Sequence, residues 1–520
     1  MRRLVCAVAA ALALAAPASA ETVLKVSLHS DLKIVDPIWT TALISAHYGN
    51  MVYDTLFSVD DKLQPKPQMV DKWTVSPDKL TWTFTLREGL EWHDGKPVTG
   101  EDCVASIRRW AAKDSMGQKL MSVVSELGAP DARTIRMVLK EPYGLVLDSL
   151  AKPSANIPFM MPKRVADTDP NTQITDYTGS GPFIFSKDEW KPGEKAVFLK
   201  NTKYKPRSEP ANGLAGGKVV KVDRVEWITI PDQQTQVSAL LNGEIDMVEN
   251  VPPDLLPLLQ KERNVKVMVV NKAGRQYSLR FNVLHKPFDN PKIREAVLYA
   301  LDQKPVLEAN VGNADYYTPC KSVFPCGSPL ATTKGWDDKL SGNAARAREL
   351  LKEAGYDGTP LVLLHQTDIA GHNQLATVAK PQLEAAGFKI DLQAMDWQTL
   401  VARRARKDPL ASGGWSAYFT SWGSPDVMNP VSAAFINASC DKATFGWSCD
   451  AEIEKLRDAF AKETDPGKQK EIAEQVSLRL SGGYPTFVPL GQFTVPTAIR
   501  SNVTGLLAVP ELALWNVEKK

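Results

Sequence analysis

The sequence predicts an α/β protein built from two or more domains. Strand-like and helix-like stretches alternate along its 520 residues, and alternation of this kind is typical of α/β folds. The chain is too long for one compact core, so several domains are expected. Hydrophobic residues make up 43% and charged residues 23%, with ordinary Gly and Pro contents. This composition excludes a disordered, collagenous or low-complexity protein.

Individual elements can be predicted from local patterns. Residues 81–87 alternate polar and apolar side chains with period two, which predicts a strand with one buried face. A helix is predicted to begin at Pro291, because Asn290 can cap it and proline suits the first turn. Asp465-Pro466 repeats this arrangement and predicts a helix as far as about residue 480. Residues 203–217, rich in Pro, Gly and charge, predict a surface loop.

The charge balance is informative about partners. The chain has 62 basic and 60 acidic residues. Its first 20 residues contain Arg2 and Arg3 and no acidic residue, so the remainder has 60 of each sign. Nucleic acid and anionic membrane surfaces both attract proteins with a basic excess. A neutral chain therefore argues against either as the main partner.

The N-terminus has the pattern of a secretory signal peptide. Residues 1–3 are positively charged, residues 4–16 are uninterruptedly apolar, and residues 18–20 have the small-x-small form of a cleavage site. Cleavage after Ala20 would yield an exported protein that begins at Glu21. A retained N-terminal anchor is the alternative, although the apolar run is too short to span a bilayer.

The five cysteines after residue 20 agree with export. Cys320 and Cys326 form one close pair, and Cys440 and Cys449 form another. Two disulfides are favoured, because secreted proteins use cysteines in this way. A metal site is the alternative, but neither spacing is the CxxC of zinc sites. Cys103 occupies an apolar position of a predicted helix and is expected to be buried and inert.

Catalytic motifs are absent from the sequence. It contains no GxSxG, no HExxH and no phosphate-binding GxxxxGK[ST]. The closest two of its six histidines, His365 and His372, are seven residues apart, which is a poor metal-binding spacing. A pair of glycosidase carboxylates stays open, because carboxylates are plentiful. We therefore expect neither catalysis nor a cofactor.

Several stretches together resemble one family. The most specific, residues 82–102 (WTFTLREGLEWHDGKPVTGED), is similar to the signature TFxLRxGvxfHDGxPvTaeDV. Further matching stretches are 35–37, 51–57, 178–185, 201–204, 241–246 and 280–302. They resemble the large solute-binding proteins of ABC importers, which include periplasmic dipeptide-, oligopeptide- and nickel-binding proteins. The resemblance covers essentially all of the chain after the signal peptide.

The resemblance implies a two-lobed periplasmic-binding-protein fold with a hinge and an extra subdomain inserted in lobe I. Lobe I would comprise residues 21–55, 176–275 and a return at 490–520, with the inserted subdomain at 56–175 and lobe II at 276–489. It also implies a periplasmic monomer that binds a small-molecule solute between its lobes and delivers it to inner-membrane permease subunits. Closure of such lobes around a ligand is a known hinge motion.

Aromatic side chains concentrate at residues 397–447. Binding clefts combine aromatic walls with a few polar groups, and loops at strand ends hold ligands in α/β lobes. The candidate ligand contacts in this region are Trp397, Arg404, Trp415, Tyr418, Trp422, Ser424 and Asp426. Core packing is the alternative for any single aromatic residue.

The resemblance adds two further candidate regions. Residues 273–277 should lie at a lobe crossing, where Arg275 and Tyr277 would face the cleft, and Arg275 can clamp a carboxylate. The N-terminal loop supplies Asp31, Leu32 and Ile34. Surface exposure is the alternative for Arg275.

The resemblance also suggests the class of solute. In peptide-binding relatives a Trp-x-x-Asp loop presents a carboxylate to the ligand's α-ammonium group, whereas here Asp426 follows Trp422 by one place more. Asp426 either still reaches an amine or belongs to a cleft for another solute; we favour a peptide or an amino-acid-derived solute. An exported hydrolase of peptides or glycosides and a nickel- or metal-chelate-binding variant are the alternatives.

Overall fold

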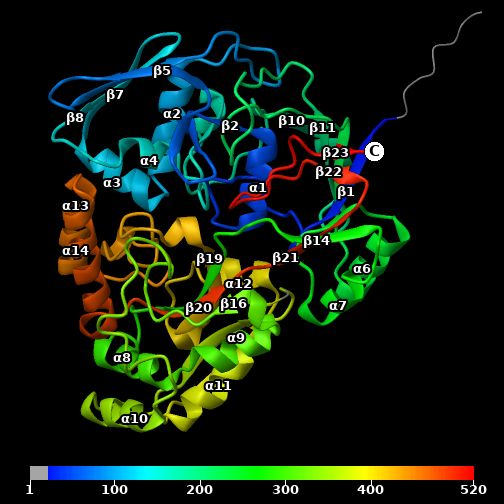
Figure 1. Ribbon diagram of the computed structural model, residues 1–520. Helices are drawn as coiled ribbons and strands as arrows, with labels where there is room; N and C mark the ends of the chain where they lie inside the picture. Colours follow the sequence, from blue (N-terminus) through cyan, green and yellow to red (C-terminus); the bar gives the residue numbers. More distant parts are fainter. Residues whose placement is uncertain (1–20, 370) are drawn as a thin grey trace, which may run out of the picture.

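The computed structural model describes residues 21–369 and 371–520, so the predicted signal peptide lies outside the described residues. Figure 1 shows three groups of strands, a small sheet at the upper left and larger sheets at the right and below. Helices cover these sheets, and the protein is mixed α/β as the sequence predicts. None of the helices among the described residues has both the length and the apolar character that a bilayer crossing requires.

The first large sheet, which we call lobe I, has seven strands. Their order is β10 (Phe183–Phe185), β11 (Lys195–Lys200), β12 (Arg224–Ile228), β1 (Val23–Ser27), β13 (Met247–Val248), β21 (Pro496–Arg500) and β14 (Val265–Val269). β1 runs parallel to both of its neighbours, and the other pairs are antiparallel. Its helices are α1 (Leu43–Val52), α6 (Gln233–Asn242) and α7 (Leu256–Leu259).

The second large sheet, lobe II, has six strands. Their order is β16 (Tyr317–Thr318), β20 (Phe487–Phe493), β15 (Arg275–Phe281), β19 (Ala417–Gly423), β17 (Leu361–Gln366) and β18 (Ile390–Met395). Its helices are α8 (Pro291–Ala300), α9 (Gln303–Val311), α10 (Ala344–Glu353), α11 (Leu375–Ala385), α12 (Trp397–Arg403), α13 (Ala451–Lys462) and α14 (Pro466–Leu478). The predicted helix starts are confirmed, because the Asn290 and Asp465 side chains cap α8 and α14.

A third unit is inserted in lobe I. Its sheet has the order β5 (Val70–Val75), β6 (Thr81–Leu86), β8 (Thr134–Leu139) and β7 (Val124–Asp131), and its helices are α2 (Gly100–Ala111), α3 (Ser115–Val123), α4 (Val146–Leu150) and α5 (Lys163–Ala166). The predicted strand at 81–87 is β6. The unit also touches lobe II, since Arg457 Nη2 of α13 donates to Ser115 Oγ at 2.6 Å.

Short paired strands complete the described secondary structure: β2 (Asp54–Thr55) with β9 (Phe159–Met160), β3 (Phe57–Val59) with β4 (Pro65–Pro67), and β22 (Val503–Thr504) with β23 (Glu518–Lys519). Cys103 is buried in α2 and makes no disulfide. Burial raises the pKa of its thiol well above the usual range. The buried environment of Cys103 therefore supports the expectation that its thiol is inert.

Two segments connect the lobes. Residues 270–274 lead from β14 into β15, and residues 494–495 lead from β20 into β21. The strands pair antiparallel on both sides of this crossing, with Val269 opposite Pro496 in lobe I and Gln276 opposite Gln492 in lobe II. The sequence-based boundaries at 275 and 490 fall on β15 and β20, so we propose to place the lobe boundaries at the two connecting segments instead.

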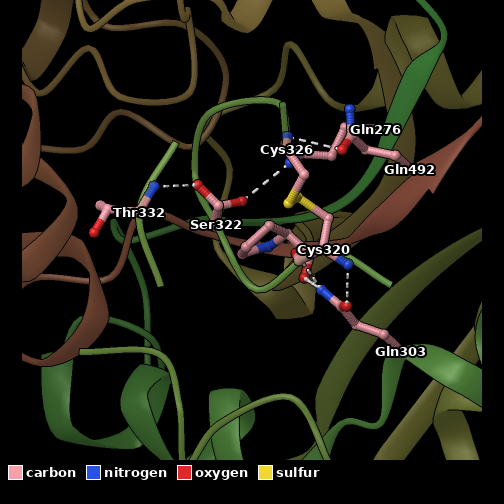
Figure 2. Close-up of a disulfide and its surroundings, with 8 residues drawn as sticks. Gln276, Gln303, Cys320, Ser322, Cys326, Thr332 and Gln492 are labelled. Carbon is pink, nitrogen blue, oxygen red and sulfur yellow. Dashed lines mark hydrogen bonds between the residues drawn. A yellow bond between two sulfur atoms is a disulfide. The ribbon is translucent and has the colours of Figure 1, made fainter. Parts of the chain in front are cut away.

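Two disulfides, Cys320–Cys326 and Cys440–Cys449, join the cysteines that the spacing pairs. Figure 2 shows how the first one is held against the end of the lobe II sheet. Gln276 of β15 donates to Ser322 O at 3.1 Å, and Gln492 of β20 accepts from Cys326 N at 2.8 Å. The disulfide loop is thus fixed to the two strands that enter the crossing.

The segment 178–182 packs against the end of α1. His93 Nε2 lies 3.1 Å from Gly181 O, and Gly181 N donates to Val52 O at 2.9 Å. Burial lowers the pKa of His93 to about 4, so its ring is neutral at physiological pH. A side chain at Gly179 would place its Cβ 1.9 Å from Val52 O, which explains why glycine stands in this motif.

Gly179→Ala should therefore destabilise the protein. Overpacking against backbone typically costs about 1–3 kcal/mol, and the transition in differential scanning calorimetry should move to lower temperature. Gly128→Ala in β7 is the matched control, because no atom lies within 4 Å of its added Cβ. Equal unfolding temperatures for the two variants would contradict the packing argument.

Candidate functional site

A cavity lies between lobe I and lobe II at the crossing segments. It contains about 1710 Å³ of empty space, part of it open to solvent. Lobe I contributes the end of β1, the start of α1 and residues 249–252, and lobe II contributes α12 and the end of β19. Both crossing segments line it as well, so a change in the angle between the lobes would change its shape.

Six of the twelve predicted ligand contacts line this cavity: Arg275, Tyr277, Trp397, Arg404, Trp422 and Asp426. The structure brings them together from β15, α12 and the end of β19. That these six residues contact a solute stays a prediction, and their positions in the cavity wall agree with that prediction.

The N-terminal candidates do not line the cavity. Asp31 accepts hydrogen bonds from Gly193 N at 2.7 Å and Thr229 Oγ1 at 3.1 Å, so its carboxylate points away into lobe I. Leu32 is buried in the lobe I core, and Ile34 is also outside the cavity wall. Their neighbours His29 and Ser30 line the cavity instead.

Three lobe II candidates are also outside the cavity wall. Trp415 and Tyr418 are fully buried and pack edge to face, with ring centroids 5.2 Å apart. Tyr418 precedes Trp422 by four residues on β19, which places it roughly 13 Å deeper along the strand. Ser424 is buried and does not line the cavity.

A buried acidic pair lies at one wall, which Asp426 lines directly. Ser154 Oγ of the inserted unit donates to Asp426 Oδ2 at 2.7 Å and also contacts Glu511 Oε1. Asp426 is 3% and Glu511 1% exposed. Asp426 Oδ1 has no hydrogen-bond donor among the described residues, whereas Glu511 Oε2 lies 3.2 Å from His47 Nε2. Two adjacent buried carboxylates, one of them with a free oxygen, favour a cationic partner.

Burial and the neighbouring Glu511 charge raise the pKa of Asp426 to about 7, although the Lys152 ammonium opposes this. Lys152 does not reach Asp426, because it is hydrogen-bonded to Asp114 and to Ala155 O. The carboxyl of Asp426 therefore changes its charge near physiological pH.

A histidine–glutamate cluster lies beside this pair. His29 Nδ1 is 2.8 Å from Glu249 Oε2, and His47 Nδ1 is 3.7 Å from Glu249 Oε1. His47 Nε2 is in turn 3.2 Å from Glu511 Oε2. Desolvation lowers the pKa of His47, but the charges of Glu249 and Glu511 outweigh it and raise that pKa above its ordinary value. Desolvation raises the pKa of Glu249, but the two histidines overcome it and lower the pKa to about 2.

Another part of the cavity lining is cationic. The Arg404 guanidinium lies over the rings of Trp397 at 5.4 Å and Phe445 at 4.9 Å, and its Nη2 donates to Thr41 Oγ1 of lobe I at 3.1 Å. Arg404 is 3% exposed, and its Nε has no hydrogen-bond acceptor among the described residues. An anionic group in the cavity would complete its hydrogen bonding.

Arg275 adds a second positive charge. Its Nε donates to Ser421 Oγ at 3.0 Å and its Nη2 to Ser421 O at 3.2 Å, which holds the guanidinium at the start of β15. The cavity therefore presents carboxylates and guanidinium groups from separate segments of the chain. A small zwitterion has the complementary charges.

The residues that sequence analysis missed are His29, His47, Ser154, Glu249 and Glu511. No local pattern marks them, because Ser154 and Glu511 are separated by 357 residues and His29 and Glu249 by 220. Only the paired strands and the inserted unit bring them together. The charges of the cleft could not be counted before the fold was known.

Comparisons with known proteins identify the family. The model for bacterial extracellular solute-binding proteins, family 5 (middle), matches residues 64–444. The probable peptide ABC transporter periplasmic-binding protein y4tO of Sinorhizobium fredii is 42% identical over 94% of this chain and 92% of its own length. The glutathione-binding protein GsiB of Escherichia coli K12 is 27% identical over 94% and 92%, respectively.

The fold comparison agrees with this. The structure of AgaA from A. tumefaciens R10 in complex with agropinic acid superposes with a TM-score of 0.80 at 22% identity, covering 96% of this chain and 99% of AgaA. The two-lobed periplasmic-binding-protein fold is thereby confirmed. Proteins of this family are exported, bind a small solute and serve membrane permeases. This chain belongs to the bacterial extracellular solute-binding proteins of family 5 and is the solute-binding component of an ABC transporter.

Proposed function

We propose that the protein binds a zwitterionic, peptide-like or amino-acid-derived solute. Its ammonium group would face Asp426 and Glu511, and its carboxylate would face Arg404 and Arg275. The observation that carries this proposal is a pair of buried atoms without hydrogen-bond partners among the described residues, Asp426 Oδ1 and Arg404 Nε, on two residues that line one cavity.

The physical reason is the cost of burying charge. A charged group that leaves water without a partner loses several kcal/mol of solvation, and a partner with hydrogen bonds of good geometry recovers it. A solute that supplies both an ammonium group and a carboxylate therefore gains affinity from each of these groups. The names of the relatives support this class, since one is a probable peptide-binding protein and another binds glutathione.

The remaining parts of the proposal concern the working protein. We propose a periplasmic monomer that begins at Glu21 after cleavage behind Ala20, with no catalytic activity of its own. Solute binding would favour the closed arrangement, because the ligand contacts both lobes only when they meet. Trp397, Trp422 and Tyr277 would contact the apolar parts of the solute.

Blocked peptides test the two ends of the solute. The mature protein should bind a dipeptide or tripeptide in isothermal titration calorimetry, and N-acetylation or C-terminal amidation should each weaken binding by about 100-fold, because each leaves buried charges unpaired. Asp426→Asn should lower the affinity for the free peptide and reduce the penalty of N-acetylation. Asp408→Asn, at an exposed carboxylate of lobe II, is the control. Equal affinities for free and blocked peptides would refute the proposal.

Affinity should also depend on pH. An ammonium group needs ionised Asp426, whose pKa is about 7, so the affinity should fall as the pH drops from 7.5 to 5. The loss should approach tenfold per pH unit below pH 7. Protonation of His47, beside Glu511, acts in the same direction because it adds positive charge. Calorimetry at constant ionic strength should show this slope for the wild-type protein and a shallower one for Asp426→Asn; a pH-independent affinity would contradict it.

A further inference from the structure

Three potential metal ligands meet on the lobe I wall of the cavity. Among the described residues, one nitrogen each from His29 and His47 and one oxygen from Glu249 lie within 4.8 Å of one another. All three side chains line the cavity. None of the three ligands belongs to the acidic pair of Asp426 and Glu511, although Glu511 contacts His47.

The fold explains why these residues meet. His29 and Glu249 each follow the end of a strand, β1 and β13, and these two strands are parallel neighbours, so both residues emerge at the same edge of the sheet. His47 comes from the middle of α1, which starts beside this edge. All three belong to lobe I, so the cluster is formed whether the lobes are open or closed.

The chemistry of the three side chains is that of a transition-metal site. Two imidazoles and one carboxylate suit zinc, nickel and copper ions, and sites with three protein ligands keep a position open for an exogenous ligand. The His47 side chain is 3% exposed, and its Nδ1, on the Glu249 side, has no hydrogen-bond partner among the described residues. Glu511 lies 3.2 Å from the other ring nitrogen, as carboxylates that orient metal-binding histidines do.

We propose that His29, His47 and Glu249 form a binding site for a divalent transition-metal ion whose open coordination position faces the solute cavity. A carboxylate, amine or thiolate of a bound molecule would take the fourth position. The site would therefore admit a metal complex, or let a metal ion bridge the protein and its solute. The proposal concerns lobe I alone and does not rest on the proposed peptide-like solute.

A cluster without metal is the competing arrangement. In it, a protonated His47 would bridge the carboxylates of Glu249 and Glu511 as a simple cation. The two arrangements differ in one measurable property, because only the first binds a metal ion at a 1:1 ratio with two imidazole nitrogens.

Calorimetry with metal salts tests the site. The full mature chain, purified without a histidine tag and treated with chelator, would be titrated with ZnCl2 and with NiCl2 in the absence of solute. We expect one saturable site, weakened at least about 100-fold in His29→Gln and in His47→Gln. His285→Gln is the matched control, since His285 lies in lobe II outside the cavity and contacts Lys407 O. Undiminished binding in folded His29→Gln or His47→Gln, or no stoichiometric binding by the wild type, would overturn the proposal.

A second measurement avoids variants that fail to fold. Electron paramagnetic resonance of the wild-type protein with one equivalent of Cu²⁺ should show hyperfine coupling to two imidazole nitrogens. A spectrum of hydrated or carboxylate-only copper would also overturn the proposal. Because neither measurement uses a peptide, their result is separate from the test of the proposed solute.

Discussion

The pairing of two antiparallel strands through both lobes is the constraint on which the rest of the structure depends. β14 pairs with β21 in lobe I, β15 pairs with β20 in lobe II, and only residues 270–274 and 494–495 lie between. The close approach also requires Gly274, whose φ is +72° and whose added Cβ would lie 2.7 Å from Phe493 O. The cavity forms at this junction, so its walls are positioned by the same hydrogen bonds that join the lobes.

The charges of the cavity depend on this junction in turn. The acidic pair combines Asp426 of lobe II with Glu511 of the C-terminal segment, and Ser154 of the inserted unit links them. Arg404 of lobe II reaches Thr41 of lobe I. Buried charges of this kind destabilise a protein unless a partner is supplied. The fold thus holds buried charged groups that lack partners, and a ligand with the complementary charges offsets the free-energy cost of their burial.

The sequence predicts the local elements well because they depend on neighbouring residues. The caps at Asn290 and Asp465, the alternation of β6 and both disulfide pairs follow from short patterns. The site is only partly predictable. The crossing and a strand-end loop predict Arg275 and Asp426, which line the cavity, whereas Glu511 and Ser154 come from distant segments without a motif. In the loop after β1 the resemblance suggests Asp31, whereas the cavity is lined by its neighbours His29 and Ser30, and Asp31 is hydrogen-bonded to Gly193.

The position of β21 has a consequence for how the chain assembles. It lies between β13 and β14, although it is made more than 220 residues after either of them. Lobe II is continuous in sequence from β15 to β20, so all of its strands have been synthesised before β21 appears. During synthesis or translocation, lobe II is free to fold as a unit while the lobe I sheet still has a gap beside β13. The last strand of the lobe I sheet to emerge, β21, closes that gap, and a chain truncated before residue 496 would leave β14 without its strand partner.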